Sequence, residues 1–365
     1  MKVCFIAGTL GRGGAERQLH FMLRALQSED VACRVLCLTR GESYEKQIES
    51  LGIQIEYVGS SRNRIRRLTS IIDRLRSEPA DILQSSHFFS NIYAALAGRV
   101  LGIPSIGAVR GDLMQAIAAN GYLGNSQLKW PHHLIANSQR AVTDAIQKGI
   151  ERRNIDFLRN VVDLDNGAKL KKVNIRENLT ILFVGRLVPL KRPDVFLKLA
   201  SKLRRDLPDS ILDFRIAGDG PLRRQSEQLA KDLGLFPDSI KFFGEVPEMD
   251  DIYENTDILV LTSMHEGTPN VILEAMSYGI PVVATKVGGV PEVLSESCGI
   301  MVDPDDFGEL CAATSKLILD GDLRCRMGRQ AQEYVRKNHS IGYLQEKLKC
   351  IYSGLLQQRG ASAYD

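Results

Sequence analysis

Short apolar runs rich in β-branched residues alternate with helical patterns along the chain. In the first half these runs lie at 2–7, 33–38, 81–84, 104–109, 133–136 and 155–158. After a polar stretch at 163–179 the rhythm resumes with TILFVG at 180–185 and continues to GIMV at 299–302. Strands that alternate with helices form parallel sheets, so the pattern predicts an α/β chain made of two doubly wound, Rossmann-like domains.

The length fits this division, because 365 residues suit two domains of roughly 150 to 200 residues each. The polar stretch at 163–179 marks the change between them. We therefore expect one domain over 1–165 and a second from 166 onward. Ligands of doubly wound folds bind outside the carboxyl ends of the strands, so the functional loops are expected to face a cleft between the domains.

The composition excludes several classes of protein. Hydrophobic residues at 44% and charged residues at 25% are ordinary for a globular chain, and a net charge of +3 is too small for a nucleic-acid partner. Seven cysteines without a C-x-x-C pair predict reduced thiols. The apolar stretch 91–109 contains Arg99 and Pro104, and no signal-peptide cleavage site follows the first strand. We expect a cytoplasmic protein whose membrane contact, if any, is peripheral.

Residues 62–76 form a strongly basic segment, with six arginines against one aspartate. Ile65, Leu68, Ile72 and Leu75 recur within it at helical spacing. One interpretation is a surface helix that packs its apolar stripe on the sheet and leaves the arginines in water. The other is a basic face that docks on an anionic membrane surface, and both interpretations stay open.

The stretch HEGTPNVILEAM at 265–276 places Glu266 and Glu274 eight positions apart. Thr268 is a good N-cap and Pro269 suits the first helical position, so a helix is expected to begin inside the motif. The amides of residues 267–271 would then form an anion-binding helix start between two carboxylates. A nucleotide-sugar has a diphosphate between two hydroxyl-bearing groups and would fit this arrangement. The alternative is that both glutamates are solvated surface residues.

The loop GTLGRGGAER at 8–17 follows the first strand and opens a helix. It does not satisfy G-x-G-x-x-G, because Glu16 occupies the third glycine position, and no acidic residue ends the second strand. These departures weaken a dinucleotide-binding interpretation. Gly13 and Gly14 remain candidates for a close backbone approach to a ligand.

The second domain opens with FVGRLVPLKRPDVF, a strand followed by a glycine, a loop and a helix. Arg186 and Lys191 in this loop are expected to rise toward the ligand. Two cations can neutralise a diphosphate without a metal, through charge-assisted hydrogen bonds of about 1.5 to 3 kcal/mol each. Because no dense cluster of aspartate and histidine is present, we expect neither a metal nor a cofactor.

Six motifs follow one another along the chain: GGAER at 13–17, G-R-L-x(3)-K at 185–191, AGDGPL at 217–222, FFGEV at 242–246, EGTPNVILE at 266–274 and GGVPEV at 288–293. In these motifs the chain resembles the family-four retaining glycosyltransferases of the GT-B fold. Their order and spacing agree over the whole second domain. The resemblance implies that 1–165 binds the acceptor, that 166–344 binds the donor, and that 345–365 packs back on the first domain.

The resemblance also implies a role for each site residue. Glu274 would accept hydrogen bonds from the ribose hydroxyls and Glu266 from the hydroxyls of the donor sugar. The remaining donor-binding positions are Arg186, Lys191, Gly13 and Gly14 at the diphosphate, Val246 near the base, and Gly267, Thr268, Pro269, Asn270 and Val271 at the helix start. Members of the family often carry a histidine after a first-domain strand, near the sugar. His87 and Arg110 are the candidates here for sugar or acceptor contacts.

The implied activity is transfer of a sugar, with retention, from a nucleoside diphosphate sugar to a hydroxyl acceptor, with Glu266, Arg186 and Lys191 as the expected catalytic residues. Uridine diphosphate sugars are the expected donors, and a lipid-linked saccharide in surface polysaccharide synthesis is the expected acceptor. A nucleotide-sugar epimerase or phosphorylase of the same fold is an alternative. Another is a catalytically silent binding subunit.

Overall fold

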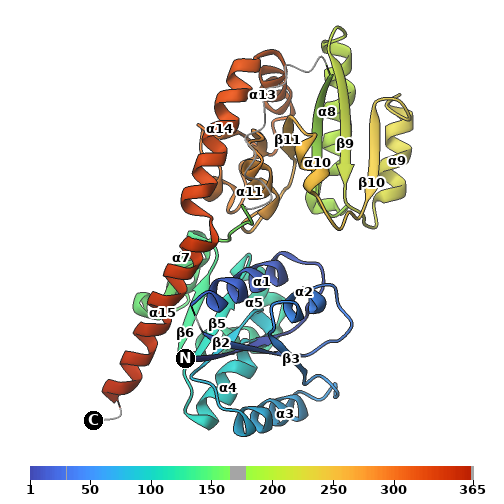
Figure 1. The fold of residues 1–365 in the computed structure, drawn as a ribbon. Coiled ribbons are helices and arrows are strands. Elements are labelled where there is room, and N and C mark those ends of the chain that lie inside the picture. Colours follow the sequence, from blue (N-terminus) through green and yellow to red (C-terminus); the bar gives the residue numbers. More distant parts are fainter. Residues whose placement is uncertain (30, 165–177, 363–365) are drawn as a thin grey trace. The chain divides into compact units, whose positions relative to one another are not determined.

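The computed structural model describes residues 1–29, 31–164 and 178–362 and divides the chain into two compact units. Unit 1 comprises Met1–Val161 and Ser340–Asp365, and unit 2 comprises Val162–His339. Each unit is a parallel β-sheet with helices on both faces (Figure 1). The predicted boundary at 165/166 falls outside the described residues. The predicted polar stretch reaches two residues too far, because a strand already begins at Asn178.

The sheet of unit 1 contains seven parallel strands in the order β3-β2-β1-β4-β5-β6-β7. Their bounds are β1 Lys2–Ala7, β2 Ala32–Cys37, β3 Gln54–Tyr57, β4 Ile82–Ser85, β5 Ser105–Val109, β6 His133–Ala136 and β7 Ile155–Phe157. The strand order reverses between β1 and β4. That reversal is the position where ligands of such sheets bind.

Helices cover both faces of this sheet because successive strand residues point to opposite sides. Val3 and Phe5 pack against α1, while Cys4 and Ile6 pack against α3 and α4. Figure 1 shows α1 and α2 on one side of the strands and α3 and α4 on the other. The helices are α1 Gly14–Gln27, α2 Glu45–Glu49, α3 Arg64–Ser77, α4 Asn91–Leu101, α5 Leu113–Ala119, α6 Gly124–Lys129, α7 Gln139–Gln147 and α15 Ile341–Ser362.

The helix α15 belongs to unit 1 although it follows the whole of unit 2 in the sequence. Leu344, Leu348 and Tyr352 are buried in the same core as α1. The buried Tyr352 hydroxyl donates a 2.5 Å hydrogen bond to Gln84 Oε1 in β4. The expected second domain therefore ends too late, at 344, because Leu344 already anchors this helix in the core of unit 1.

The sheet of unit 2 has six parallel strands in the order β10-β9-β8-β11-β12-β13. Their bounds are β8 Asn178–Val184, β9 Ile211–Ala217, β10 Ile240–Gly244, β11 Ile258–Leu261, β12 Val282–Thr285 and β13 Gly299–Val302. Here the order reverses between β8 and β11. The two units therefore repeat one topology.

The helices of unit 2 also form two layers. Phe183 and Ile181 of β8 pack with α8, α9 and α13, whereas Leu182 packs with α10, α11 and α14. The helices are α8 Pro193–Asp206, α9 Arg223–Asp232, α10 Asp250–Glu254, α11 Asn270–Ser277, α12 Val290–Val293, α13 Phe307–Leu319 and α14 Gly321–Asn338. No described helix is long and apolar enough to cross a membrane.

The predicted apolar stripe of α3 is wrong at its first member. Ile65 is 72% exposed, while Ile71, Ile72 and Leu75 are buried on the sheet. Asn63 accepts hydrogen bonds from the amides of Ile65 and Arg66, so Ile65 lies in the first turn, beyond the edge of the buried face.

We predict that Tyr352→Phe loosens the packing of α15 in unit 1. The change leaves buried Gln84 Oε1 without this donor, which costs about 1 to 3 kcal/mol. Hydrogen exchange of the α1 and α15 amides measures this locally, which matters because a chain of two domains need not unfold in one step. Tyr343→Phe is the matched control, since that hydroxyl has no hydrogen-bond partner in the described chain. Equal protection in both variants would contradict the prediction.

Candidate functional site

The loops that follow β8 and β11 meet at the strand reversal of unit 2. Lys191 ends a short 3₁₀ turn after β8, and Glu266 lies in the loop after β11. Lys191 Nζ donates a 2.5 Å hydrogen bond to Glu266 Oε1, and their side chains are only 23% and 9% exposed. Ser263 Oγ donates to the same carboxylate oxygen at 2.5 Å. Lys191 and Glu266 thus form a largely buried ion pair. The sequence resemblance assigns them to separate parts of the ligand, the diphosphate and the sugar.

Two glycines hold the Glu266 backbone in place. Gly288 has a φ of +50°, and a Cβ there would lie 1.8 Å from the carbonyl oxygen of Glu266. A Cβ at Gly289 would lie 2.3 Å from the carbonyl oxygen of Gly267, and the Gly289 amide donates to that oxygen at 3.0 Å. The GGVPEV motif therefore packs its backbone directly on the loop of Glu266. Only glycine permits so close an approach.

A second close backbone approach shapes the loop of Arg186. The amide of Leu187 donates to Asp219 O at 2.9 Å, and the amide of Leu222 donates to Leu187 O at 3.0 Å. A Cβ at Gly218, where φ is +140°, would lie 2.0 Å from the Gly185 carbonyl oxygen. The AGDGPL turn thus packs directly on the loop after β8. Arg186 is exposed on that loop and has no side-chain partner among the described residues.

The helix α11 begins one residue later than the sequence indicated. Pro269, with φ −75° and ψ 104°, is the N-cap, and Asn270 is the first helical residue. Thr268 is therefore not the cap. The residue before a proline is biased away from helical angles, which places Thr268 outside the helix. Gly267, Thr268, Asn270 and Val271 are half-buried at this helix start, and Pro269 is buried.

Glu274 lies one turn into α11 and has a partner that the sequence did not indicate. The hydroxyl of Tyr253, from α10, donates to Glu274 Oε2 at 2.8 Å. Tyr253 is buried and stacks on Tyr278, with ring centroids 5.4 Å apart. This carboxylate is therefore held by a fixed phenol. Val246 follows β10 and packs partly buried beside the same core.

In unit 1 the strand reversal carries a different pair of side chains. His87, after β4, lies with Nε2 3.1 Å from Glu16 Oε1, and the amide of Gly8 donates to its Nδ1 at 3.2 Å. These contacts fit a neutral imidazole that donates from Nε2. Thr9 Oγ1 also donates to Glu16. Burial disfavours the ionised carboxyl, but the hydrogen bonds from His87 and Thr9 outweigh it and lower the pKa of Glu16.

The other unit 1 candidates lie on the same edge of the sheet. Gly13 is the exposed N-cap of α1, and Gly14 is its exposed first residue. Arg110 follows β5 and directs its guanidinium toward Met22 Sδ, at 3.4 Å. Its buried Nε has no hydrogen-bond partner among the described residues, and burial lowers the pKa of Arg110 to about 10.

Sequence reasoning missed the residues that orient the charged groups. Ser263, Tyr253 and Glu16 each contact a predicted site residue. No sequence pattern indicates these three contacts. The adjacent glycines at 288–289 do indicate a close backbone approach, because a residue without a Cβ permits one. Within the described ranges, no group of three or more histidine, cysteine or acidic side chains is placed to hold a metal ion.

We predict that Glu16→Gln destabilises unit 1 in a pH-dependent way. The pKa of Glu16 is lower in the folded chain than its ordinary value of 4.5, so its ionised form stabilises the fold above that pH and the stabilisation is lost as pH falls through the folded pKa. The stability difference between wild type and variant should be greatest near neutral pH and shrink below pH 4.5. Hydrogen exchange of the α1 amides, measured in wild type and variant over a range of pH, gives this stability difference.

The control is Glu29→Gln, which removes an exposed ion pair with Lys349. Added salt should abolish any effect of that change, because exposed charges are screened. A Glu16→Gln difference that stays constant down to strongly acidic pH would contradict the assignment of the ionised carboxyl.

Two protein families match the chain, one over each half. Residues 12–166 match Glycosyltransferase Family 4, and residues 166–334 match Glycosyl transferases group 1. Together the matches span both units.

Two enzymes illustrate the similarity to characterised proteins. One is the GalNAc-alpha-(1->4)-GalNAc-alpha-(1->3)-diNAcBac-PP-undecaprenol alpha-1,4-N-acetyl-D-galactosaminyltransferase of Campylobacter jejuni, 25% identical over 96% of this chain and 98% of that enzyme. The other is D-inositol 3-phosphate glycosyltransferase of Corynebacterium kroppenstedtii, 34% identical over 43% of this chain. The second match spans only 36% of the relative's length.

Solved structures share the fold at low sequence identity. Anabaena HepE in complex with UDP-glucose superposes with a TM-score of 0.80 at 20% identity, covering 97% of this chain and all of that one. The lipopolysaccharide outer core galactosyltransferase WaaB gives 0.76 at 18% identity, over 97% and 100% of the two chains. With both halves matched and both units built as doubly wound sheets, the chain belongs to the family-four glycosyltransferases of the GT-B fold.

Proposed function

We propose that this glycosyltransferase moves a sugar from a uridine diphosphate sugar to a hydroxyl of a lipid-linked saccharide, with retention of anomeric configuration. The observation that carries the proposal is the arrangement around the start of α11. The Lys191–Glu266 pair lies before the helix, and Glu274, held by Tyr253, lies one turn into it. Support for the donor comes from HepE, which binds UDP-glucose, and support for the acceptor from the undecaprenol-linked substrate in the name of the Campylobacter enzyme.

Each group then has a distinct task. Glu274 accepts the ribose hydroxyls, and Glu266 accepts a hydroxyl of the transferred sugar. The diphosphate lies at Lys191, Arg186 and the backbone N–H groups of residues 268, 270 and 271. When the bond between the anomeric carbon and the phosphate oxygen breaks, the leaving diphosphate gains negative charge near these donors, which stabilises the transition state without a metal. The acceptor oxygen bonds to the anomeric carbon, and its proton passes to the leaving phosphate.

Glu274→Ala and Glu266→Ala should separate donor binding from transfer. Glu274→Ala should weaken UDP by about tenfold to 150-fold, because it removes hydrogen bonds of about 1.5 to 3 kcal/mol. Glu266→Ala should keep UDP binding, since it frees Lys191 from its carboxylate partner, yet lose sugar transfer. Calorimetric titration of UDP, GDP and ADP with a chelator present, together with a transfer assay, measures both effects.

Glu254→Ala is the matched control, because Glu254 is an exposed glutamate on the helix that carries Tyr253. It should change neither quantity. Full transfer by Glu266→Ala would refute the sugar-orienting role. Absence of nucleotide binding in the wild type would favour the silent binding subunit, and release of nucleotide without acceptor would favour an epimerase or phosphorylase.

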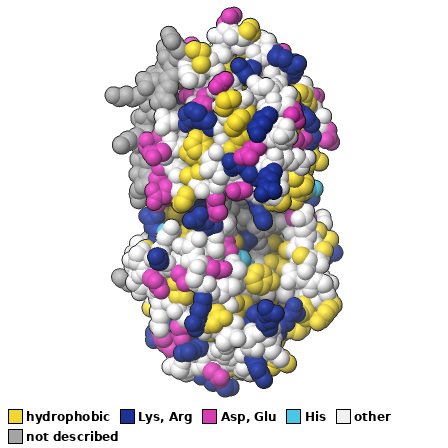
Figure 2. All heavy atoms as spheres, turned by 90° about the vertical axis from the view of Figure 1, so that its right-hand side faces the viewer, with side chains coloured by type: hydrophobic (Ala, Val, Ile, Leu, Met, Phe, Trp, Pro, Cys, Tyr) yellow, Lys and Arg dark blue, Asp and Glu magenta, His cyan; other side chains and the backbone are white. Residues whose placement is uncertain are grey.

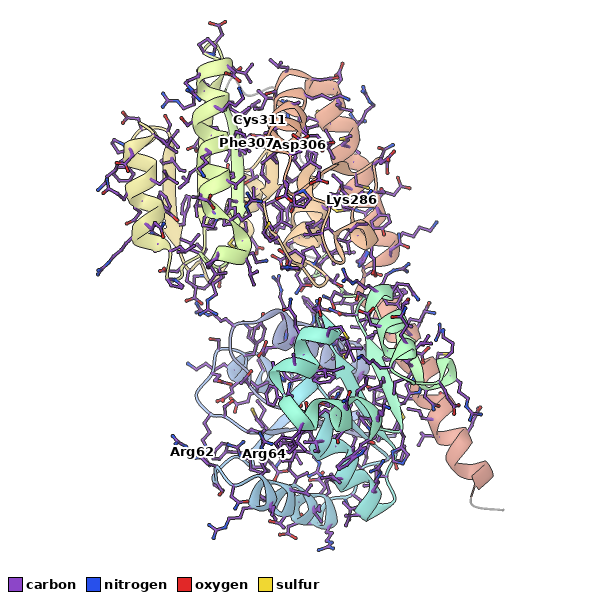
Figure 3. The ribbon with its side chains drawn as sticks, turned by 180° about the vertical axis from the view of Figure 1, so that it is seen from behind. Arg62, Arg64, Lys286, Asp306, Phe307 and Cys311 are labelled. Carbon is purple, nitrogen blue, oxygen red and sulfur yellow. The ribbon has the colours of Figure 1, made fainter. Side chains whose placement is uncertain are left out.

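The acceptor proposal includes contact between the start of α3 and an anionic membrane surface. Arg62, Arg64 and Arg66 are exposed around exposed Ile65 and have no acidic partner in the described chain. Figure 3 shows Arg62 and Arg64 where the chain enters α3. The first turn of α3 contains no acidic residue, although a helix N-terminus favours negative charge. These cations therefore do not stabilise the helix itself, and we propose that they bind anionic lipid.

The other end of α3 provides the contrast. Arg74 pairs with Glu56 at 3.1 Å, and Arg76 lies 3.7 Å from Asp73. On the face in Figure 2, basic and acidic side chains are intermingled, so local pairing decides which cations remain available. We expect the paired arginines to add little to lipid binding.

We predict that the double change Arg64→Gln, Arg66→Gln weakens binding to vesicles containing phosphatidylglycerol by about 30-fold, from about 1 kcal/mol per basic residue. The matched control is the double change Arg74→Gln, Arg76→Gln, which should have little effect. Co-sedimentation at low and high salt measures both. Equal losses in the two double variants, or equal binding to neutral vesicles, would contradict the α3 assignment.

A further inference from the structure

Arg192 has an unusual backbone conformation for its residue type. Its φ and ψ are 49° and 56°, and it is the one non-glycine residue with positive φ in the described ranges. This left-handed conformation costs a residue with a side chain about 1 to 2 kcal/mol, whereas glycine adopts it freely. Arg192 lies between the 3₁₀ turn that ends at Lys191 and the helix α8 that starts at Pro193. A strained position beside a site residue points to a role for the side chain.

The Arg192 side chain connects three loops at the carboxyl edge of the unit 2 sheet. Its guanidinium donates to Pro304 O at 2.8 Å, in the loop after β13. It also lies 3.2 Å from Met264 Sδ, in the loop after β11, and 3.8 Å from the carboxylate of Asp305. One side chain of the β8 loop thereby contacts the loops that follow β11 and β13.

Backbone contacts fix the same segment from the other side. Thr262 Oγ1 donates to the carbonyl oxygens of Lys191 and Arg192, at 2.9 and 3.0 Å. The amide of Met264 donates to Leu190 O at 2.8 Å. Together with the guanidinium these bonds set the position of the Lys191 Cα, from which a flexible four-carbon chain extends to Glu266.

We propose that Arg192 is a positioning residue whose left-handed turn and guanidinium hold Lys191 where its ammonium meets the donor diphosphate. The inference rests on the proposed function, in which Lys191 contacts that diphosphate. Charge stabilisation of a leaving group depends on donors that are already in place, and a displacement of about 1 Å costs up to about 100-fold in rate. Arg192 itself touches neither Glu266 nor, in this proposal, the donor.

A cavity beside Arg192 makes the proposal testable by chemical rescue. Its volume is about 160 Å³, and its lining includes Arg192, Val195, Thr285, Pro304 and Phe307. Asp306 and Phe307 also line this cavity, and Figure 3 shows both at the start of α13. Removal of the Arg192 side chain would enlarge the cavity and leave Pro304 O and Asp305 to receive a free guanidinium ion.

The decisive variant is Arg192→Gly, because glycine keeps the left-handed turn without strain while the side-chain contacts are lost. We expect it to fold with wild-type thermal stability but to lose transfer activity by about tenfold to 100-fold and to bind UDP more weakly. Millimolar guanidinium chloride should restore part of the activity. Arg192→Ala should lose similar activity and also stability, since alanine retains the strain.

Lys191→Met provides the comparison, because it removes the ammonium itself and guanidinium should not rescue it. Wild-type transfer and UDP affinity in Arg192→Gly, with both lost in Lys191→Met, would overturn the inference and leave the proposed function standing. Full transfer by Lys191→Met would overturn both. Activity losses that follow thermal stability across the Arg192 variants, without rescue, would make Arg192 a purely structural residue and also overturn the inference.

Discussion

The ion pair between Lys191 and Glu266 is the interaction around which unit 2 is organised. It connects the loops after β8 and β11, the two strands between which the sheet reverses its order. A charged pair with so little exposure is stable only where its geometry is fixed and its remaining hydrogen bonds are made. Ser263 supplies one such bond, and the close approach of Gly288 to the Glu266 carbonyl fixes the loop. The glycine motifs of unit 2 thus hold in place the loops that carry the charged side chains.

Unit 1 repeats this plan with the acid on the other side of the strand reversal and a histidine in place of the lysine. Its acid, Glu16, comes from the helix after the first strand, and its nitrogen base, His87, follows the strand on the other side of the reversal. In unit 2 the cation follows the first strand and the acid follows its neighbour. A shared topology therefore dictates where a polar pair bridges the sheet, while the residue types at that place differ. Under the proposed function the anion is bound by unit 2, because its pair contains a permanent cation beside a helix start.

The sequence was sufficient for most strands of both sheets because buried parallel strands are continuous apolar runs. It failed at β3, Gln54–Tyr57, an edge strand with polar residues at alternate positions, and at Ile65, whose helical spacing continued past the buried face of α3. Within the site, motif positions such as Glu274 were readable. Its partner Tyr253 was not, because a hydrogen bond between two helices leaves no pattern in either one. Contacts across the fold are set by packing, which local periodicity does not encode.

Under the proposed function, the same ion pair makes binding of the sugar depend on binding of the diphosphate. Glu266 cannot serve fully as an acceptor for sugar hydroxyls while Lys191 and Ser263 both donate to its Oε1. A diphosphate that takes the ammonium of Lys191 replaces one charge-assisted hydrogen bond by another of similar strength, so the exchange costs little. It also releases lone pairs on Glu266 at the moment when the sugar arrives beside it. Phosphate recognition and sugar orientation are then two consequences of one exchange of partners, which explains why a cation and a carboxylate with different tasks lie in direct contact.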